Sequence, residues 1–266
     1  MIRSDMAVEL VGGKTEIADS ARIKKSRIEV DAEVSAKIKK PEGIYITVET
    51  GIVNSGRVDK YDTLSKALSC AVRELSPDTK SVLVVGLGNP NLTADALGQK
   101  VFSNLLITRH LSGEYAKESG LDIGVSVSAI CPNVSGVTGI ESFDVIKGVV
   151  DRVKPGLVIA VDSLASAAVG RIASAFQLCS TGITPGSGVA NHRMRLDKDS
   201  LGVDVISIGV PLVVYASTII QEATGSYAPD GVSDIIMNLI VTPKTIDLLV
   251  EECGKIIASA INRAFS

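Results

Sequence analysis

The sequence predicts an α/β fold in which a mostly parallel sheet lies between helices. Downstream of Ser81, short apolar runs alternate with stretches of helical periodicity, which is the pattern of right-handed βαβ units. Hydrophobic residues make up 45% of the chain, yet it has only five Tyr, four Phe and no Trp. A core with so few rings must be built from aliphatic side chains, which suits buried parallel strands. The length of 266 residues allows one large domain, and we expect residues 1–266 to form it.

Residues 1–60 have a different pattern from the rest of the chain. The β-like runs Arg27–Val30 and Ile44–Glu49 alternate there with glycines and charged clusters. Between them, Lys37–Gly43 combines lysines with a Pro and a Gly, which predicts an exposed turn. We therefore expect a β-rich N-terminal segment, followed by an alternating β/α core over residues 61–266.

The elements of this core follow from local patterns. Strands are expected at the apolar runs Ser81–Gly86, Ile123–Ile130, Leu157–Val161, Phe176–Cys179 and Val203–Val210. Helices are expected at Tyr61–Leu75, Thr93–Leu105, Glu141–Val153, Leu164–Ile172, from about Val213, and from Thr242 to about Ala264. Thr93 is expected to cap its helix, and Pro243 to lie in the first turn of the last one.

Charge and composition exclude several classes of partner. The chain has 27 basic and 30 acidic residues. Because it has no surplus of positive charge, we do not expect it to bind nucleic acid. The longest uncharged stretch, Val205–Gln221, is interrupted by Gly209 and Pro211 and predicts no membrane span. The N-terminus carries no apolar secretory signal, so we expect a cytoplasmic protein. The four cysteines are scattered and only two histidines are present, so no metal site and no cofactor are expected.

Ligands of α/β sheets bind at loops that follow the carboxyl ends of strands. Two such loops carry a carboxylate, Asp95 after the strand at Ser81–Gly86 and Asp162 after the strand at Leu157–Val161. A charge at the end of an apolar strand is costly unless it is paired or functional. Two neighbouring carboxylates can share a proton, so that one acts as an acid and the other as a base. The alternative is structural, because an aspartate in the first turn of a helix also complements the helix dipole.

Other residues in these loops suggest weaker hypotheses. Gly86-Leu87-Gly88 resembles a phosphate-binding turn, but Asn91 replaces the third glycine and no Walker lysine follows, so a tight strand-to-helix turn is favoured. Ser187 lacks a GxSxG context, and Cys179 with His192 is a less favoured nucleophile pair. The residues expected to bind substrate or support the loops are Gly86, Gly88, Asn89, Gly186, Ser187 and Gly188.

Long strings of the sequence resemble one known family. They are VVGLGNPNLTADALG (84–98), NLLITRHL (104–111), GVTGIESFDVIKGVV (136–150), VIAVDSLA (158–165), TGITPGSGVAN (181–191), LGVDVISIGVP (201–211) and VTPKTIDLLVE (241–251). Together they resemble the germination protease family, whose members degrade small acid-soluble spore proteins when endospores germinate. The similarity runs from about residue 3 to the C-terminus.

This resemblance implies a fold, a chemistry and a setting. The fold would be similar to that of the hydrogenase-maturation peptidases, and the activity that of an atypical aspartic-type endopeptidase. The two proposed catalytic aspartates of the family match Asp95 in NLTADALG and Asp162 in VIAVDSLA. The resemblance further implies small acid-soluble spore proteins as substrates, a homotetramer made as a zymogen, and a location in the forespore or spore core.

The chain also departs from the family pattern. Thr184 stands where relatives commonly have His, Tyr215 stands where they often have Asp, and only residues 221–240 fill a usually longer segment. Two alternatives therefore stay open beside the aspartic peptidase. One is a metal-dependent peptidase of the hydrogenase-maturation type, with a metal bridging Asp95 and Asp162. The other is a catalytically silent binding homologue.

The N-terminus resembles the family's own cleavage sites. Substrates of the family are cut after an acidic residue in strings such as Thr-Glu-(Phe or Ile)-Ala-Ser-Glu, and Ser4–Glu9 has the same order of residue types. We therefore predict self-processing between Asp5 and Met6. A second similar string, Thr15–Ser20, is expected to be shielded by strand pairing. The alternative for the first string is that Met1–Asp5 is a frayed end that is never cut.

Overall fold

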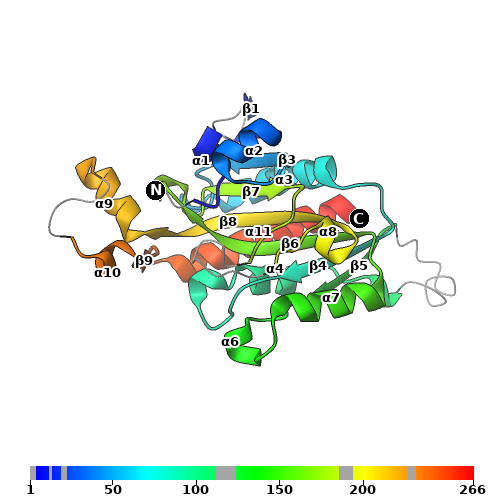
Figure 1. Ribbon diagram of the computed structural model, residues 1–266. Coiled ribbons are helices and arrows are strands. Elements are labelled where there is room, and N and C mark those ends of the chain that lie inside the picture. The colour runs from blue at the N-terminus through cyan, green and yellow to red at the C-terminus, as the bar shows by residue number, and fades with distance from the viewer. Residues whose placement is uncertain (1–3, 12–13, 19–22, 112–123, 186–193, 227–231) are drawn as a thin grey trace.

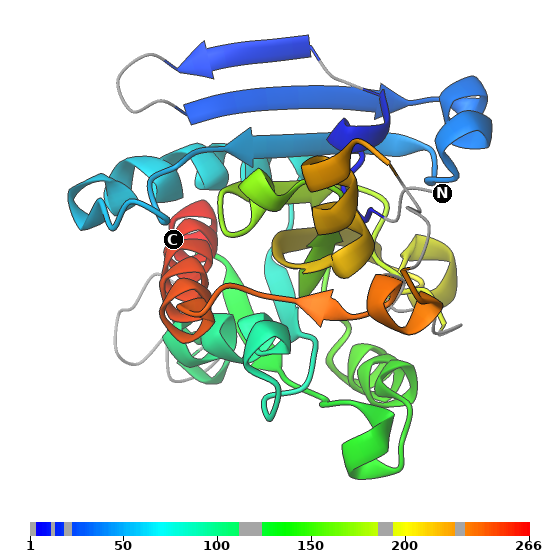
Figure 2. The same ribbon diagram turned by 90° about the vertical axis from the view of Figure 1, so that its left-hand side faces the viewer.

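The computed structural model describes residues 4–11, 14–18, 23–111, 124–185, 194–226 and 232–266, and their nine strands form one sheet. The strands are β1 (Lys14–Ala18), β2 (Ile23–Val30), β3 (Gly43–Glu49), β4 (Ser81–Gly86), β5 (Ser126–Ile130), β6 (Leu157–Ser166), β7 (Ala175–Cys179), β8 (Asp204–Tyr215) and β9 (Ile240–Val241). Their order is β1-β2-β3-β7-β8-β6-β4-β5, and β9 pairs with β8 outside this path. The β-rich N-terminal segment is confirmed, because β1, β2 and β3 form one end of the sheet (Figure 2).

The sheet is mixed, and parallel pairing is confined to its other end. β8, β6, β4 and β5 run parallel to one another, whereas β1, β2, β3, β7 and β9 all pair antiparallel, β7 and β9 with β8. The prediction of a mostly parallel sheet therefore holds only for these four strands. A strand that returns to the sheet in the parallel direction needs a crossover connection of about a dozen residues. The link from β6 to β7 is shorter than this and holds no α-helix, and β7 pairs antiparallel.

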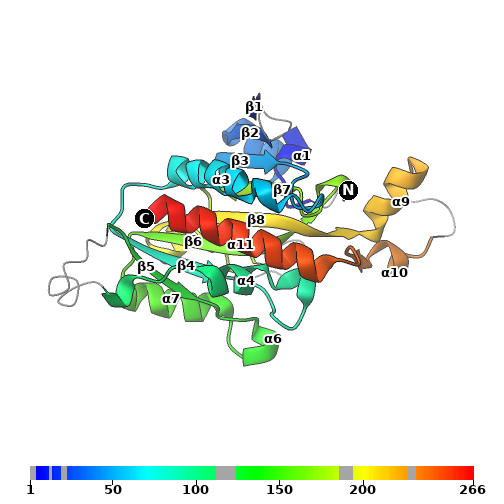
Figure 3. The ribbon, with the colours of Figure 1, turned by 180° about the vertical axis from the view of Figure 1, so that it is seen from behind.

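Helices cover both faces of the sheet (Figures 1 and 3). The described α-helices are α1 (Val8–Val11), α2 (Ala32–Ile38), α3 (Tyr61–Leu75), α4 (Leu97–Asn104), α6 (Ser135–Thr138), α7 (Ser142–Val153), α8 (Lys198–Leu201), α9 (Ala216–Thr224), α10 (Asp234–Met237) and α11 (Ile246–Phe265). α3, α4 and α11 pack on one face, where Val82 and Val84 of β4 are buried. α7 and α8 cover the opposite face, where Leu83 and Val85 of β4 are buried. The central strands are apolar on both sides for this reason.

Several predicted elements are confirmed closely. α3 and β4 have the predicted bounds, and β7 and α7 differ from their predictions by one residue at the start. β5 begins at Ser126, inside its predicted run, and ends at the predicted residue, Ile130. Among the residues described, no helix is both long enough and apolar enough to cross a lipid bilayer.

Two segments that were predicted to be helical begin inside strands of the structure. Residues 164–172 were expected to be helical, but β6 continues to Ser166 and a 3₁₀ turn follows at Val169–Arg171. The helix expected from Val213 begins only at Ala216, because β8 extends to Tyr215. Both errors have one cause. β6 and β8 continue to pair with each other there, and this backbone ladder outweighs the local preference for a helix.

Three other boundaries also differ from the prediction. Thr93 caps no helix, because Thr93–Asp95 is a separate 3₁₀ turn and α4 begins at Leu97. α11 begins at Ile246 rather than near Pro243, since residues 240–241 form β9 and the Thr242 hydroxyl donates to the carbonyl of Leu212. Part of the turn expected at Lys37–Gly43 belongs to α2. This helix ends at Ile38, and Lys39 follows it as the C-cap in a left-handed conformation.

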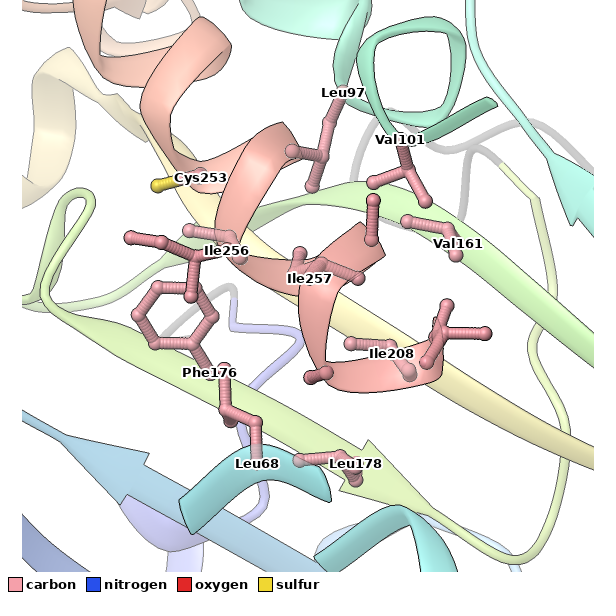
Figure 4. Packing of buried hydrophobic residues seen from close by; sticks show 14 of the residues in the cluster. Leu68, Leu97, Val101, Val161, Phe176, Leu178, Ile208, Cys253, Ile256 and Ile257 are labelled. Atoms are coloured by element: carbon pink, nitrogen blue, oxygen red, sulfur yellow. The ribbon is translucent and has the colours of Figure 1, made fainter. Parts of the chain in front are cut away.

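The largest described core cluster lies between α11 and the sheet (Figure 4). Ile257 of α11 is fully buried in this cluster together with Val161 and Phe176. Such a side chain has no room to be shortened without leaving a cavity, because protein interiors are packed as densely as organic crystals.

Replacing Ile257 by Ala is expected to lower the free energy of unfolding by about 2–5 kcal/mol, since it removes buried methyl groups and leaves a void. Leu248→Ala on the same helix is the matched control, because Leu248 is 58% exposed. Denaturant unfolding measures both. Equal losses for the two variants would contradict this account of the core.

Candidate active site

A cavity of about 610 Å³ opens where β4, β6 and β8 end. Its polar lining includes Asp5, Thr93, Asp95, Asp162, Ser163 and Tyr215. β6 runs past the end of β4. The last residue of β4, Gly86, pairs with Val161, and β6 continues with Asp162. The structure therefore brings both aspartates that were predicted from strand ends into one cavity.

Asp95 is held by the loop that leaves β4. Its Oδ2 accepts a hydrogen bond of 2.8 Å from the backbone N–H of Asn89. Gly88 lies against it with a φ of +98°, and a Cβ at this position would lie 2.0 Å from the carbonyl oxygen of Asp95. Only glycine fits there, since an L side chain would have both the wrong conformation and no space. Gly88 and Asn89 therefore hold Asp95 in its position in the loop.

Gly86 has a packing role in the same turn. A Cβ on Gly86 would lie 2.4 Å from the carbonyl oxygen of Gly98, and one on Gly98 would lie 2.4 Å from the backbone nitrogen of Leu87. The glycines thus let the backbones of β4 and α4 meet. This close approach accounts for the Gly86-Leu87-Gly88 string without a phosphate and favours the tight turn over the nucleotide hypothesis.

Asp162 is only 6% exposed, and its Oδ1 accepts a hydrogen bond of 2.9 Å from the backbone N–H of Ser163. The hydroxyl of Ser163 is buried and has no hydrogen-bond partner among the described residues. An unpaired hydroxyl that lines a cavity can bind a ligand there. No pattern in the sequence assigns a role to Ser163.

Asp5 lines the cavity from the other end of the chain. Its backbone N–H donates to the carbonyl of Ala165, and its Oδ2 accepts from the N–H of the same residue. Met6 and Ala7 are fully buried. The interpretation of the first residues as a frayed end is therefore wrong for Asp5. The apolar string after Asp5 was the one signal in the sequence that this segment belongs to the core.

The cysteines show no sign of an activated nucleophile. Cys179 is buried, and its Sγ lies 3.0 Å from the hydroxyl of Ser207. Cys131 lies against Gly98, and burial raises the pKa of its thiol to about 11. A thiol with so high a pKa stays protonated at neutral pH and is a poor nucleophile.

The third predicted loop is described only in part. Thr184 is half-buried and precedes Pro185, which lines the cavity. Gly186, Ser187, Gly188 and His192 lie outside the described residues. β1 pairs with β2 through all its residues, so the part of the cleavage-like string from Thr15 to Ala18 lies in a paired strand, and the rest of it lies outside the described residues.

In the described ranges of the chain, no group of three or more His, Cys, Asp or Glu side chains is arranged to hold a metal ion. Structural and catalytic metal sites in proteins use at least three protein ligands in most cases. We therefore derive no catalytic step through a metal.

Comparison with known proteins places the sequence in a family. The model of the germination protease family matches residues 4–228. The chain belongs to the germination protease family. It is 40% identical to the germination protease of Caldanaerobacter subterraneus subsp. tengcongensis, over 99% of this chain and 94% of that protein. It is 36% identical to the germination protease of Clostridium acetobutylicum, with the same coverage.

Membership identifies the chain as an aspartic-type peptidase of the germination protease family. The alignment with the Caldanaerobacter germination protease spans 304 positions, whereas this chain has 266 residues. This relative therefore carries insertions that the present chain lacks, in agreement with the expectation that the chain is shorter than is usual in the family. The germination protease of Priestia megaterium is 41% identical over 80% of this chain and 59% of its own length.

One solved structure is also similar. It is the [NiFe] hydrogenase maturation protease HycI from Thermococcus kodakarensis, with a TM-score of 0.41 and 18% sequence identity. The match covers 73% of this chain and 98% of that protein.

Gly88→Ala is expected to lower peptidase activity at least about 10-fold, because the new Cβ would push Asp95 out of its position. The strained φ should also cost about 1–3 kcal/mol of stability. Gly148→Ala is the control, because Gly148 lies in α7 with no atom within 4 Å of its Cβ position. Initial rates and thermal unfolding midpoints check both variants. Unchanged activity of Gly88→Ala would show that this contact does not position Asp95.

Proposed function

We propose that the protein is an endopeptidase that begins the degradation of small acid-soluble spore proteins, cutting after an acidic residue. The observation that carries the proposal is the meeting of Asp95 and Asp162 in one cavity at the ends of parallel strands. Family membership supports the substrate class, and the string resemblance supports the acidic cleavage site. A homotetramer and a location in the forespore or spore core stay predictions of the resemblance.

The proposed chemistry divides the work between the two carboxyl groups. Asp95 is ionised and takes a proton from a water molecule, whose oxygen then attacks the scissile carbonyl carbon. Asp162 is protonated and donates a hydrogen bond to the carbonyl oxygen, where negative charge develops. When the tetrahedral intermediate collapses, the C–N bond breaks and Asp162 passes its proton to the leaving amine, after which Asp162 receives the proton that Asp95 took from water. Both carboxyl groups return to their starting states.

The surroundings of the two side chains support this assignment. Asp95 is half-buried, accepts a backbone N–H and lies directly before the N-terminus of α4, three features that favour a negative charge. Asp162 is buried where β6 pairs with β8, one residue beyond the last pair with β4, and burial favours the neutral form of a carboxyl group.

Asp95→Asn and Asp162→Asn are each expected to reduce cleavage of a small acid-soluble spore protein by about 10³-fold or more, because an amide can neither accept nor give the proton. The cuts are mapped by mass spectrometry of the fragments. Asp144→Asn is the matched control, since Asp144 is exposed on α7.

Near-normal turnover by either variant would remove that aspartate from the mechanism. The same assay separates the alternatives. Loss of wild-type activity with a chelator would favour a metal-dependent peptidase. Retained binding of the spore protein without any cleavage would indicate a silent homologue.

We also propose self-processing between Asp5 and Met6, as the resemblance of Ser4–Glu9 to a cleavage site predicts. The position of Asp5 in the same cavity as the two aspartates supports it. Because Met6 is fully buried, the segment must first detach for an extended peptide to reach the pair. Incubation at mildly acidic pH should remove the first five residues from the intact mass. An unchanged mass, or trimming that persists in Asp162→Asn protein, would contradict self-processing.

A further inference from the structure

We infer that a cut between Asp5 and Met6 creates an ion pair, in which the new α-ammonium group of Met6 binds the carboxylate of Glu9. This pair holds the shortened N-terminus at the edge of the sheet after the first five residues have left. The inference rests on the proposed self-processing. It names a binding site that only the processed form of the chain can fill.

The first observation is that one hydroxyl lies between the backbone nitrogen of Met6 and Glu9. The N–H of Met6 donates to the hydroxyl of Ser4 at 2.9 Å, and this hydroxyl donates to Oε2 of Glu9. Hydrolysis of the bond after Asp5 consumes one water and leaves a carboxylate on Asp5 and an ammonium on Met6. Ser4 departs with the fragment. The cut therefore removes the hydroxyl between the two groups and gives one of them a positive charge.

The second observation is that Glu9 has donors that the cut does not remove. Its side chain is 4% exposed. Oε1 accepts from the hydroxyl of Ser166 at 2.6 Å and from Nη1 of Arg171 at 3.0 Å, and Oε2 accepts from the N–H of Ala167 at 2.8 Å. All three donors lie in the stretch of chain that follows Asp162. The carboxylate is therefore already oriented, and Oε2 is the atom that loses a donor with Ser4.

The third observation is that Glu9 shares its cation with a second carboxylate. Arg171 binds Glu9 and also donates to Oε1 of Glu49 at 2.7 Å. Burial raises the pKa of Glu49, but the hydrogen bond and charge of Arg171, helped by Lys24, hold it below its usual range. Glu49 is therefore charged at neutral pH and competes for the guanidinium. An ammonium on Met6 gives Glu9 a cation of its own, and hydrogen bonds between charged groups are stronger than neutral ones.

The fourth observation is that the chain from Met6 onward has contacts that are independent of the fragment. Met6 and Ala7 are fully buried in an apolar cluster with residues of β6 and β7. The N–H of Ala7 donates to Oε1 of Gln177 at 2.7 Å. Asp5, in contrast, lines the cavity and leaves with the fragment. The cut thus takes a carboxylate out of the cavity, while the segment after it can bind the sheet again.

The neighbours of the new amine decide the sign of its pKa change. In the described structure, the titratable groups that bind or pack against residues 5–9 include Glu9 itself, Lys40, Tyr45, Arg171 and Cys179. Nζ of Lys40 lies 3.2 Å from the carbonyl of Asp5, and this partner leaves with the fragment, so the half-buried lysine can turn to solvent. Burial raises the pKa of Tyr45 to about 12, so its phenol is neutral at pH 7.

Glu9 is therefore the charge that the amine meets first. A nearby carboxylate favours the ammonium form and raises the pKa of the amine above its value in the unfolded chain. A raised pKa contributes stability that is fully present below the unfolded value and is lost as the pH rises through the folded one. The pair consequently stabilises the processed form at neutral pH, and the uncut chain, whose Met6 nitrogen is an amide, cannot form it.

A chain that begins at Met6 tests the ion pair without relying on self-processing. It is released from an amino-terminal fusion by a protease that leaves no extra residue, and nitrogen NMR of labelled methionine follows the amine. A free α-amino group titrates near about pH 8, and we expect the amine of Met6 to titrate above this range. Glu9→Gln removes the charge with little change in shape and should return the titration to about pH 8.

Glu222→Gln is the matched control. Glu222 accepts the N–H of Val169 in the same stretch of chain, but it reaches this stretch from α9. This substitution should leave the titration of the amine unchanged. A wild-type amine that titrates near about pH 8, or one that ignores Glu9→Gln, would overturn the inference. If Glu9→Gln does not fold, Glu9→Asp replaces it. That variant draws the carboxylate back and should lower the pKa part of the way, and an unchanged pKa would count against the pair.

Hydrogen exchange measures whether the pair holds the segment in place. In the shortened chain, Glu9→Gln should make the amide of Ala7 exchange at least about 10-fold faster than in the wild type. In the full-length protein the same substitution should accelerate this exchange less, because Met6 carries no charge there. Equal acceleration in the two forms would show that the ammonium contributes nothing.

The fate of self-processing is read from the intact mass of the full-length protein. A full-length chain that keeps its mass would contradict self-processing, and the titration of the shortened chain would still decide whether the pair forms. A chain that trims itself after Asp5, but whose new amine titrates near about pH 8, would overturn the ion pair alone.

Discussion

The parallel pairing of β6 with β8 is the constraint on which the rest of the molecule depends. Both strands are longer than β4, so their ladder continues beyond the point where β4 ends. This overhang carries Asp162 past the last pair with β4 and into the cavity. It also provides the backbone to which the N-terminal segment binds. A shorter β6 would remove both the buried aspartate and its support.

The candidate site contains features that would lower the stability of a protein if they occurred without a function. A carboxyl group is buried in a strand, a hydroxyl has no described partner, and a glycine is held at positive φ against Asp95. The buried carboxyl group and the unpaired hydroxyl are each unfavourable alone, and glycine is needed at the third position because an L side chain would be strained there. The two packed faces of the central strands supply the apolar burial that offsets these costs. Strain of this kind is concentrated where chemistry needs it.

The sequence predicted those parts of the structure that depend on local patterns. The apolar run of β4 and the periodicity of α3 were sufficient to predict these two elements. Asp95 and Asp162 were expected to lie close together after strands, and both line one cavity, although Asp162 lies within β6 and not after it. What could not be predicted depends on contacts between distant residues. The end of β6 is a strand because it pairs with β8, although its own residues suggest a helix. Asp5 belongs to the site only because Ala165 and Gln177 bind it.

The bond between Asp5 and Ala165 joins residues that are 160 positions apart. During synthesis the N-terminal segment leaves the ribosome first, but β6 and β7, to which it binds, are made much later. Contacts of such long range form late in folding, since the loop between them must first be closed. Met6 and Ala7 therefore stay exposed to solvent until the sheet is in place. The part of the cavity lining that Asp5 provides is therefore in place only after β6 and β7 have joined the sheet.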